Sequence, residues 1–171
     1  MSYASAYQIR SAFRDFADLS AWNAPYAVTL TLRQKRMVED DTGRSYDVRL
    51  TPERASQNFR HFLKLLNARL LGKAATRFGR SVNVIPILEG GNGKRLHYHA
   101  AIDCPRDDLR EGFHLAIITC WLKTDWGYWE HDVQPDADAG WIDYISKPCD
   151  KPVFADAIDW ANCHQPIDCR V

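Results

Sequence analysis

The stretch SVNVIPILEGGNGKRLHYHAAID, residues 81–103, decides the fold. Its two ends, Ser81–Leu88 and Leu96–Asp103, are rich in apolar residues and have the length of strands. The segment GGNG at residues 90–93 lies between them and is the strongest turn signal in the chain. The sequence therefore predicts an antiparallel hairpin, and Pro86 in its first strand favours a sheet edge or a bulge.

Further elements are expected on both sides of this hairpin. Strands are expected at 26–32 and 127–133, and helices at 4–20, 51–72, 109–121 and 140–146. The charged segment 33–47 fits an exposed loop or hairpin. The order strand, helix, strand, strand, helix, strand predicts an α+β fold: a central antiparallel sheet with helices on one face, of the ferredoxin-like and RNA-recognition-motif (RRM-like) βαββαβ kind.

No repeat, low-complexity tract or Pro/Gly linker divides the 171 residues, so the chain is expected to form one domain. Its core would span about 26–148, with a helix before it and an extension, 149–171, after it. The five cysteines are odd in number, widely spaced and without a CxxC pair. That spacing argues against a disulfide framework. The N-terminus lacks a signal-peptide pattern and no apolar run is long enough for a membrane span, so a cytoplasmic location without membrane contact is expected.

The net charge of the chain is zero, with 22 basic and 22 acidic side chains, but the two signs are segregated. Residues 1–100 hold 16 basic and 8 acidic side chains, and residues 101–171 hold 6 basic and 14 acidic ones. Such a split can mark a surface for a polyanion, although folding can also mix the two charges in space.

Three side chains in the predicted hairpin are candidate metal ligands. His97 and His99 alternate with Tyr98, so both imidazoles point to the same face of the strand. In a hairpin centred near Gly93, Glu89 lies directly opposite His97, where Cβ atoms are about 5 Å apart. The register therefore brings one carboxylate and two imidazoles together, although paired histidines on a strand are also common as ordinary surface or core residues.

A second candidate pair, Tyr144 and Lys147, lies in the segment WIDYISKP. At a spacing of i, i+3 these two side chains share a helix face. A tyrosine hydroxyl is a weak nucleophile at neutral pH, and it needs help from a metal or an ammonium group to attack a phosphodiester. The alternative is a tyrosine packed on a helix beside a solvated lysine.

Three segments in this order resemble motifs I, II and III of the HUH endonucleases: TLTLRQ (Thr29–Gln34), RLHYHAAID (Arg95–Asp103) and DYISKP (Asp143–Pro148). The resemblance covers roughly residues 26–148. It is closest to the single-tyrosine rolling-circle replication initiators (Rep proteins) of small circular replicons. Unlike many Rep proteins, the sequence has no Walker A motif.

The resemblance implies a role for each candidate residue. Glu89, His97 and His99 would bind one divalent metal, Mg²⁺ or Mn²⁺. Tyr144 would attack a phosphodiester of single-stranded DNA and form a 5′-phosphotyrosine, with Lys147 orienting the phosphate or stabilising charge. The partners would be single-stranded DNA or an origin hairpin, together with a separate helicase and polymerase. Seven basic residues are candidate DNA contacts: Arg33, Lys35, Arg36, Arg54, Lys64, Lys94 and Arg95.

Other functions remain open on the sequence. A transposase or relaxase of the same superfamily would use the same chemistry on a different DNA site. A non-catalytic RRM-like nucleic-acid-binding module could share the sheet topology. A zinc hydrolase could use the same imidazoles and carboxylate but would leave Tyr144 without a role.

Overall fold

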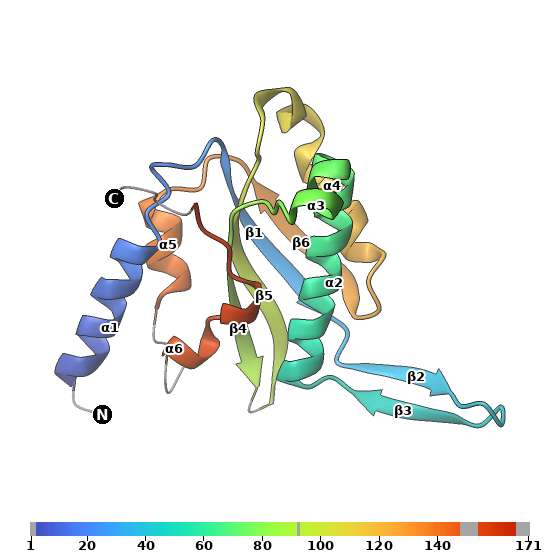
Figure 1. Ribbon diagram of the computed structural model, residues 1–171. Helices are drawn as coiled ribbons and strands as arrows, with labels where there is room; N and C mark the ends of the chain where they lie inside the picture. The colour runs from blue at the N-terminus through green and yellow to red at the C-terminus, as the bar shows by residue number, and fades with distance from the viewer. Residues whose placement is uncertain (1–2, 92, 148–153, 167–171) are drawn as a thin grey trace.

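The predicted hairpin forms half of a four-stranded antiparallel sheet in the computed structural model, which describes residues 3–91, 93–147 and 154–166. The strand order is β4-β5-β1-β6, and every neighbouring pair is antiparallel (Figure 1). The strands are β1 (Pro25–Leu32), β4 (Val84–Gly91), β5 (Lys94–Asp103) and β6 (Gly127–Gln134). The α+β class and the antiparallel sheet expected from the sequence are therefore confirmed.

One face of the sheet packs against the two long helices, α2 (Pro52–Leu71) and α4 (Arg110–Leu122). Helix α2 begins as the sequence predicts: the Thr51 hydroxyl accepts a hydrogen bond from the Arg54 N–H, and Pro52 occupies the first turn. Its apolar face buries Phe59, Phe62 and Leu66 against strand residues such as Tyr98. This cluster is the main core. A short helix, α3 (Lys73–Phe78), follows α2, and the 3₁₀ turn Asp107–Leu109 precedes α4.

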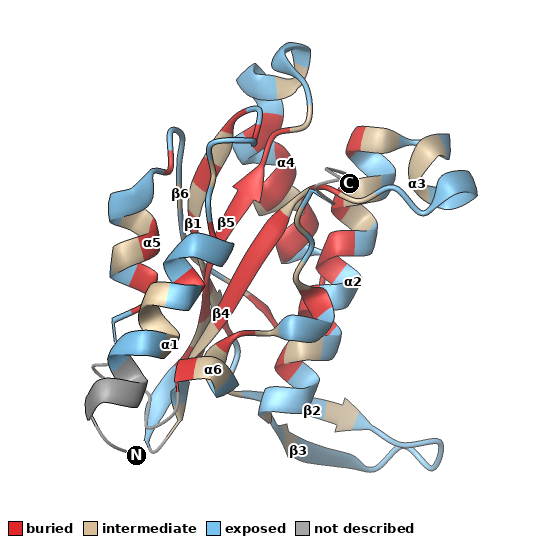
Figure 2. Ribbon diagram, turned by 60° about the vertical axis from the view of Figure 1, so that its left-hand side comes forward, coloured by how far each residue is buried: buried red, intermediate tan, exposed pale blue. Residues whose placement is uncertain are grey.

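The opposite face of the sheet is also covered, so the expectation of helices on one face only is wrong. Three helices pack there: α1 (Tyr3–Phe16), α5 (Ala139–Ile145) and α6 (Phe154–Ala157). The reason is that Ile85, Ile87 and Ala101 make this side of β4 and β5 apolar as well. Figure 2 shows the buried strands lying between the two groups of helices.

The outer edge of β4 is closed by the end of the chain. Ile158 and His164 form isolated antiparallel bridges with Ile87 and Val84, and the 3₁₀ turn Trp160–Asn162 lies between them. The Asp159 N–H donates to the Pro86 carbonyl at 3.0 Å. Pro86 has no N–H of its own, and its place on this edge strand confirms the expectation from the sequence. Residues 149–153 and 167–171 of the expected extension lie outside the described residues.

The charged segment after β1 forms a separate two-stranded hairpin, β2 (Lys35–Glu39) and β3 (Ser45–Arg49). Figure 1 shows it extending away from the sheet and helices. Its turn is held by Asp40, whose carboxylate accepts hydrogen bonds from the Thr42 and Arg44 N–H groups. Within the described ranges, no helix combines the length and apolar character needed to cross a membrane.

Candidate metal centre

The three predicted ligands converge on one point of the sheet. Glu89 pairs directly with His97 across the hairpin, as the sequence predicts. The last pair of the hairpin before the turn is Gly91 with Lys94, so the turn is centred between residues 92 and 93 rather than on Gly93. A register shift between Glu89 and Gly91 adds one residue and restores the predicted pairing.

The distances among the three side chains are those of a ligand group. The Nε2 atoms of His97 and His99 are 3.3 Å apart, and the Glu89 Oε2 lies 4.0 Å from the first and 3.8 Å from the second. A small divalent ion with bonds of about 2.1 Å holds adjacent ligand atoms about 3 Å apart. The two imidazoles and the carboxylate therefore fit such an ion, and this group could hold a metal.

Hydrogen bonds fix both imidazoles with Nε2 toward the centre. The His97 Nδ1 lies 3.0 Å from the Arg95 carbonyl, which can only accept, so Nδ1 is the donor and Nε2 is the nitrogen that faces the other two ligands. The His99 Nδ1 lies 2.9 Å from the Thr29 hydroxyl on the neighbouring strand β1. Partners of this kind orient metal-binding histidines.

Helix α5 brings Tyr144 to the same place. The Tyr144 ring centroid is 5.5 Å from that of His99, and the two planes are nearly perpendicular. Half of the Tyr144 side chain is exposed, whereas His99 is buried. Trp141, one turn earlier, stacks on Tyr144 with a centroid distance of 5.4 Å and donates from Nε1 to the Ala100 carbonyl. The Lys147 ammonium lies 5.3 Å from the Tyr144 ring centroid.

Helix α5 is fastened at its start and at its end. Asp138 caps its first turn by accepting from the Trp141 N–H, and Ile142 and Ile145 are buried beneath it. From α1, Arg10 donates to the Asp143 carbonyl and to Ser146, and Arg14 forms an ion pair with the Asp143 carboxylate. The N-terminal helix therefore contributes to the position of Tyr144.

The seven expected DNA contacts do not gather around this centre. Arg95 shares the face of His97, but its guanidinium is paired with Glu130 at 2.9 Å. Lys94 begins the same strand. Arg54 and Lys64 lie on α2, across the sheet from the metal ligands, because α2 packs on the side of Tyr98 rather than of His97 and His99.

The three basic residues after β1 have partners other than the metal ligands. Arg33 bonds the Gly127 carbonyl, Lys35 pairs with Asp47 at 3.6 Å, and Arg36 pairs with Asp125 at 3.3 Å. The last two belong to the projecting hairpin β2–β3. The seven residues therefore lie on different parts of the molecule, and their contact with DNA stays a prediction.

Two further residues belong to the site although the sequence motifs assign them no role. Thr29 lies in the first motif and alternates with buried residues, so it faces the side of His97 and His99. Trp141 lies three residues before Tyr144, a spacing that places both on one helix face. Strand alternation and helix spacing are the signals that could have identified them.

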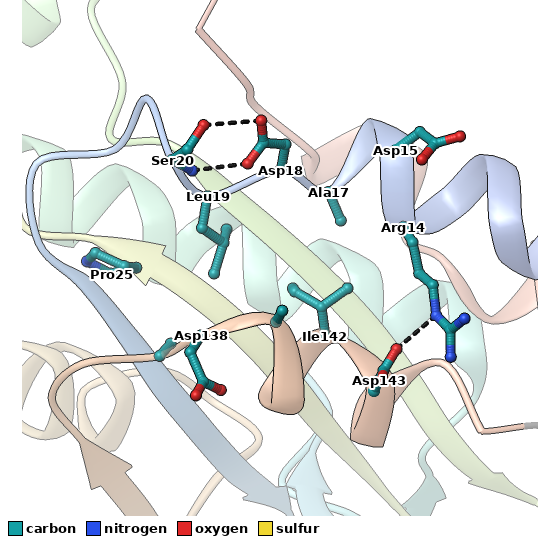
Figure 3. Close-up of a pocket in the computed structure, with 12 residues that line it drawn as sticks. Arg14, Asp15, Ala17, Asp18, Leu19, Ser20, Pro25, Asp138, Ile142 and Asp143 are labelled. Atoms are coloured by element: carbon teal, nitrogen blue, oxygen red, sulfur yellow. Dashed lines mark hydrogen bonds and ion pairs between the residues drawn. The ribbon is translucent and has the colours of Figure 1, made fainter.

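A cavity of about 770 Å³ adjoins the start of α5 but is separate from the metal ligands. Figure 3 shows it between the end of α1, the loop that follows and α5. Asp15, Asp18, Asp138 and Asp143 line it with a single cation, Arg14, which is paired with Asp143. Its acidic lining is unsuited to a phosphate ligand.

Comparison with protein-family models, with curated proteins and with solved structures finds no match to this chain.

Proposed function

We propose that the protein is a metal-dependent endonuclease and strand-joining enzyme of the HUH type, acting on single-stranded DNA. The observation that carries the proposal is the meeting of Glu89, His97 and His99 with the half-exposed Tyr144. The strand order β4-β5-β1-β6, with α2 and α4 as the connecting helices, supports the expected βαββαβ arrangement.

Glu89, His97 and His99 would hold one divalent ion, Mg²⁺ or Mn²⁺. Such an ion supplies Lewis-acid polarisation of a phosphate oxygen. The hydrogen bond from the His97 Nδ1 to the Arg95 carbonyl leaves Nε2 as the ring nitrogen that would bind the ion.

Tyr144 is the proposed nucleophile. Its hydroxyl oxygen forms a bond to phosphorus as the bond from phosphorus to the 3′ oxygen breaks. The phenolic proton leaves to solvent, and the departing oxygen takes a proton to become a free 3′-hydroxyl. The product is a 5′-phosphotyrosine, which keeps the energy of the phosphodiester and permits rejoining. The Lys147 ammonium, 5.3 Å from the Tyr144 ring centroid, stabilises the negative charge that develops.

The biological setting is proposed from the order of the three motifs. Initiation of rolling-circle replication of a small circular replicon fits that order most closely, with a separately encoded helicase and polymerase as partners. A transposase or relaxase would use the same residues, so the DNA site that the protein cleaves distinguishes the three.

The direct test is adduct formation. The protein is incubated with Mn²⁺ and labelled single-stranded oligonucleotides of candidate origin sequences, and a denaturing gel is used to detect protein-linked DNA. We expect an adduct that is lost in Tyr144→Phe and retained in Tyr46→Phe, a control in which an equally exposed tyrosine on β3 is changed. Cleavage that persists in Tyr144→Phe would support a metal hydrolase instead, and binding without any cleavage would support the RRM-like module.

A further inference from the structure

A second cavity, of about 480 Å³, lies between α2, α3 with the loop that follows it, and residues 161–164. Arg60 and Lys64 of α2 line it, together with Arg80 of the loop and His164 of the segment that pairs with β4. None of the described residues that line it is Asp or Glu. Its lining is therefore positively charged, unlike that of the acidic cavity beside α5.

The cations of this second cavity have no carboxylate partner among the residues that the structure describes. Arg60, Lys64 and Arg80 are exposed, and none of them forms an ion pair within the described ranges. By contrast, Lys35, Arg36 and Arg95, three of the seven residues expected to contact DNA, each have a carboxylate partner. Lys73 and Arg77 on α3 add further exposed charge close by in the chain. Three cations in one cavity, without an ion-pair partner in the described part of the chain, favour an anionic ligand.

The walls of the cavity are held in place by hydrogen bonds. The Asn67 side chain, on α2, donates to Ser81 at 2.9 Å and accepts from the Val82 N–H at 2.9 Å, so it joins the helix to the entry of β4. On the other side, His164 exchanges two backbone hydrogen bonds with Val84. The charged side chains therefore extend from three segments whose backbones are fixed relative to one another.

The lining also indicates what kind of anion would bind. No Phe, Tyr or Trp side chain is among the described residues that line the cavity, and the exposed Phe78 of α3 is not part of it. Proteins that hold single strands stack unpaired bases on aromatic rings, whereas the backbone of a duplex is bound through its phosphates alone. Cations without aromatic rings favour duplex phosphates.

The position of the cavity separates it from the metal centre. It lies beside α2, on the face of the sheet opposite His97 and His99, and at the far end of β4 from Glu89. Val84 and Glu89 alone are about 17 Å apart along the strand. A ligand in this cavity and a strand at Tyr144 can therefore occupy the protein together.

We propose that this cavity is a second nucleic-acid site, which binds the phosphate backbone of a duplex segment of the same DNA whose single-stranded segment is cleaved at the metal centre. The choice of DNA as the polyanion rests on the proposed function. The site is sequence-independent, since it contacts phosphates only, and it holds the DNA while the metal centre acts on the unpaired strand.

The test measures binding without cleavage, so that it does not depend on the metal centre. Labelled 20-base-pair duplex DNA of arbitrary sequence is titrated in EDTA with Tyr144→Phe protein and with the same protein carrying Arg60→Gln, Lys64→Gln and Arg80→Gln. A control carries Arg44→Gln, Arg106→Gln and Lys123→Gln, three exposed cations outside the cavity and of the same total charge. Single-stranded DNA of the same length is titrated in parallel, and thermal unfolding verifies that each variant is folded.

We expect the cavity variant to bind duplex at least tenfold more weakly than the control at moderate salt. The slope of log Kd against log salt concentration should fall by about 2 to 3, because each phosphate that the protein neutralises adds roughly 0.9 to that slope. Equal duplex affinities and equal slopes for the cavity variant and the control would overturn the site. An equal loss of affinity for single-stranded DNA would overturn the assignment to duplex. Failure of the adduct assay would leave these binding results unchanged.

Discussion

The rings of Trp141 and Tyr144 are stacked, with centroids 5.4 Å apart and planes inclined by 20°. Both rings are also nearly perpendicular to the His99 ring, with centroid distances of 5.6 Å for Trp141 and 5.5 Å for Tyr144. Trp141 is fixed to the sheet by its bond to the Ala100 carbonyl. The tryptophan therefore connects the nucleophile proposed on α5 to the strand that carries the metal ligands.

Replacing Trp141 should slow the reaction without weakening metal binding. Without the stacked ring, Tyr144 samples more rotamers, and a misplaced nucleophile reacts more slowly. We expect adduct formation by Trp141→Leu to be about tenfold slower, with Mn²⁺ affinity within about twofold of the wild type. Time courses on denaturing gels and calorimetric Mn²⁺ titration measure the two effects. Trp160→Leu, which changes an exposed tryptophan in the 3₁₀ turn Trp160–Asn162, is the control. An equal loss of adduct formation rate in both variants would argue against a positioning role for Trp141.

Thr29 should contribute to metal affinity although it is not a ligand. Its hydroxyl is the partner of the His99 Nδ1, and Thr29→Val keeps the shape of the side chain while removing this hydrogen bond. Loss of such a partner weakens metal binding by about tenfold or more. Thr31→Val is a matched control, because Thr31 faces the same side but bonds the Glu130 carbonyl. Equal Mn²⁺ affinities for the two variants, measured by calorimetry, would contradict the assignment.

Gly90 should be required for the geometry of Glu89. Its φ is +107°, and a Cβ added there would collide with the Arg95 carbonyl. Gly93 also has a positive φ, +90°, but a Cβ on it meets nothing within 4 Å. We expect Gly93→Ala to cost about 1–2 kcal/mol in the free energy of unfolding, and Gly90→Ala at least about 1 kcal/mol more. Urea unfolding measures both, and equal costs would show that the close approach at Gly90 is unimportant.

Tyr98 should make the protein less stable at alkaline pH. It is fully buried on β5 and donates to the Asp159 carboxylate at 2.8 Å. Burial, followed by the negative charge of Asp159, raises the pKa of Tyr98 well above its usual value. Below about pH 10 the phenol is protonated in both states. Above that pH the unfolded chain releases the proton and the folded protein retains it, so the free energy of unfolding falls as pH rises.

The variant Tyr98→Phe isolates this effect. It should be less stable at neutral pH by about 1–2 kcal/mol, because Asp159 loses one hydrogen-bond donor. Between about pH 9.5 and 11, roughly the range in which a free tyrosine ionises, its stability should fall less steeply than that of the wild type. Urea unfolding across this range gives both slopes. Parallel slopes would contradict the raised pKa.

The hairpin was predictable in detail, and its surroundings were not. Alternation placed His97 and His99 on one face, and the glycine-rich turn placed Glu89 opposite His97, because both depend on residues close in the chain. The sequence placed the centre of the turn on Gly93, whereas it lies between residues 92 and 93. The bulge at Gly90 restores the predicted pairing of Glu89 with His97 all the same. The apolar run VIPIL of β4 is buried on both faces, and this is the signal that could have corrected the expectation of helices on one face only. It does not identify α1, α5 and α6 as the covering helices.

The positions of the basic residues were the least predictable part. Arg60 and Lys64 lie on the same helix as Phe59 and Phe62, and only the packing of those phenylalanines decides which side of the sheet the cations reach. His164 joins them through a bridge to Val84, far earlier in the chain. Contacts between such distant segments leave no periodic signal in the sequence.

The central claim is that Tyr144 becomes linked to DNA at the metal centre, and peptide mapping of the adduct tests it most directly. The wild-type protein is incubated with Mn²⁺ and a library of single-stranded oligonucleotides with randomised sequence. The covalent adduct is isolated under denaturing conditions and digested with nuclease and protease, and the peptides are analysed by mass spectrometry. We predict a nucleotide attached through its 5′ phosphate to Tyr144, absent in EDTA and absent in His97→Ala. A nucleotide on any other residue, or an adduct of equal yield in EDTA, would contradict the account.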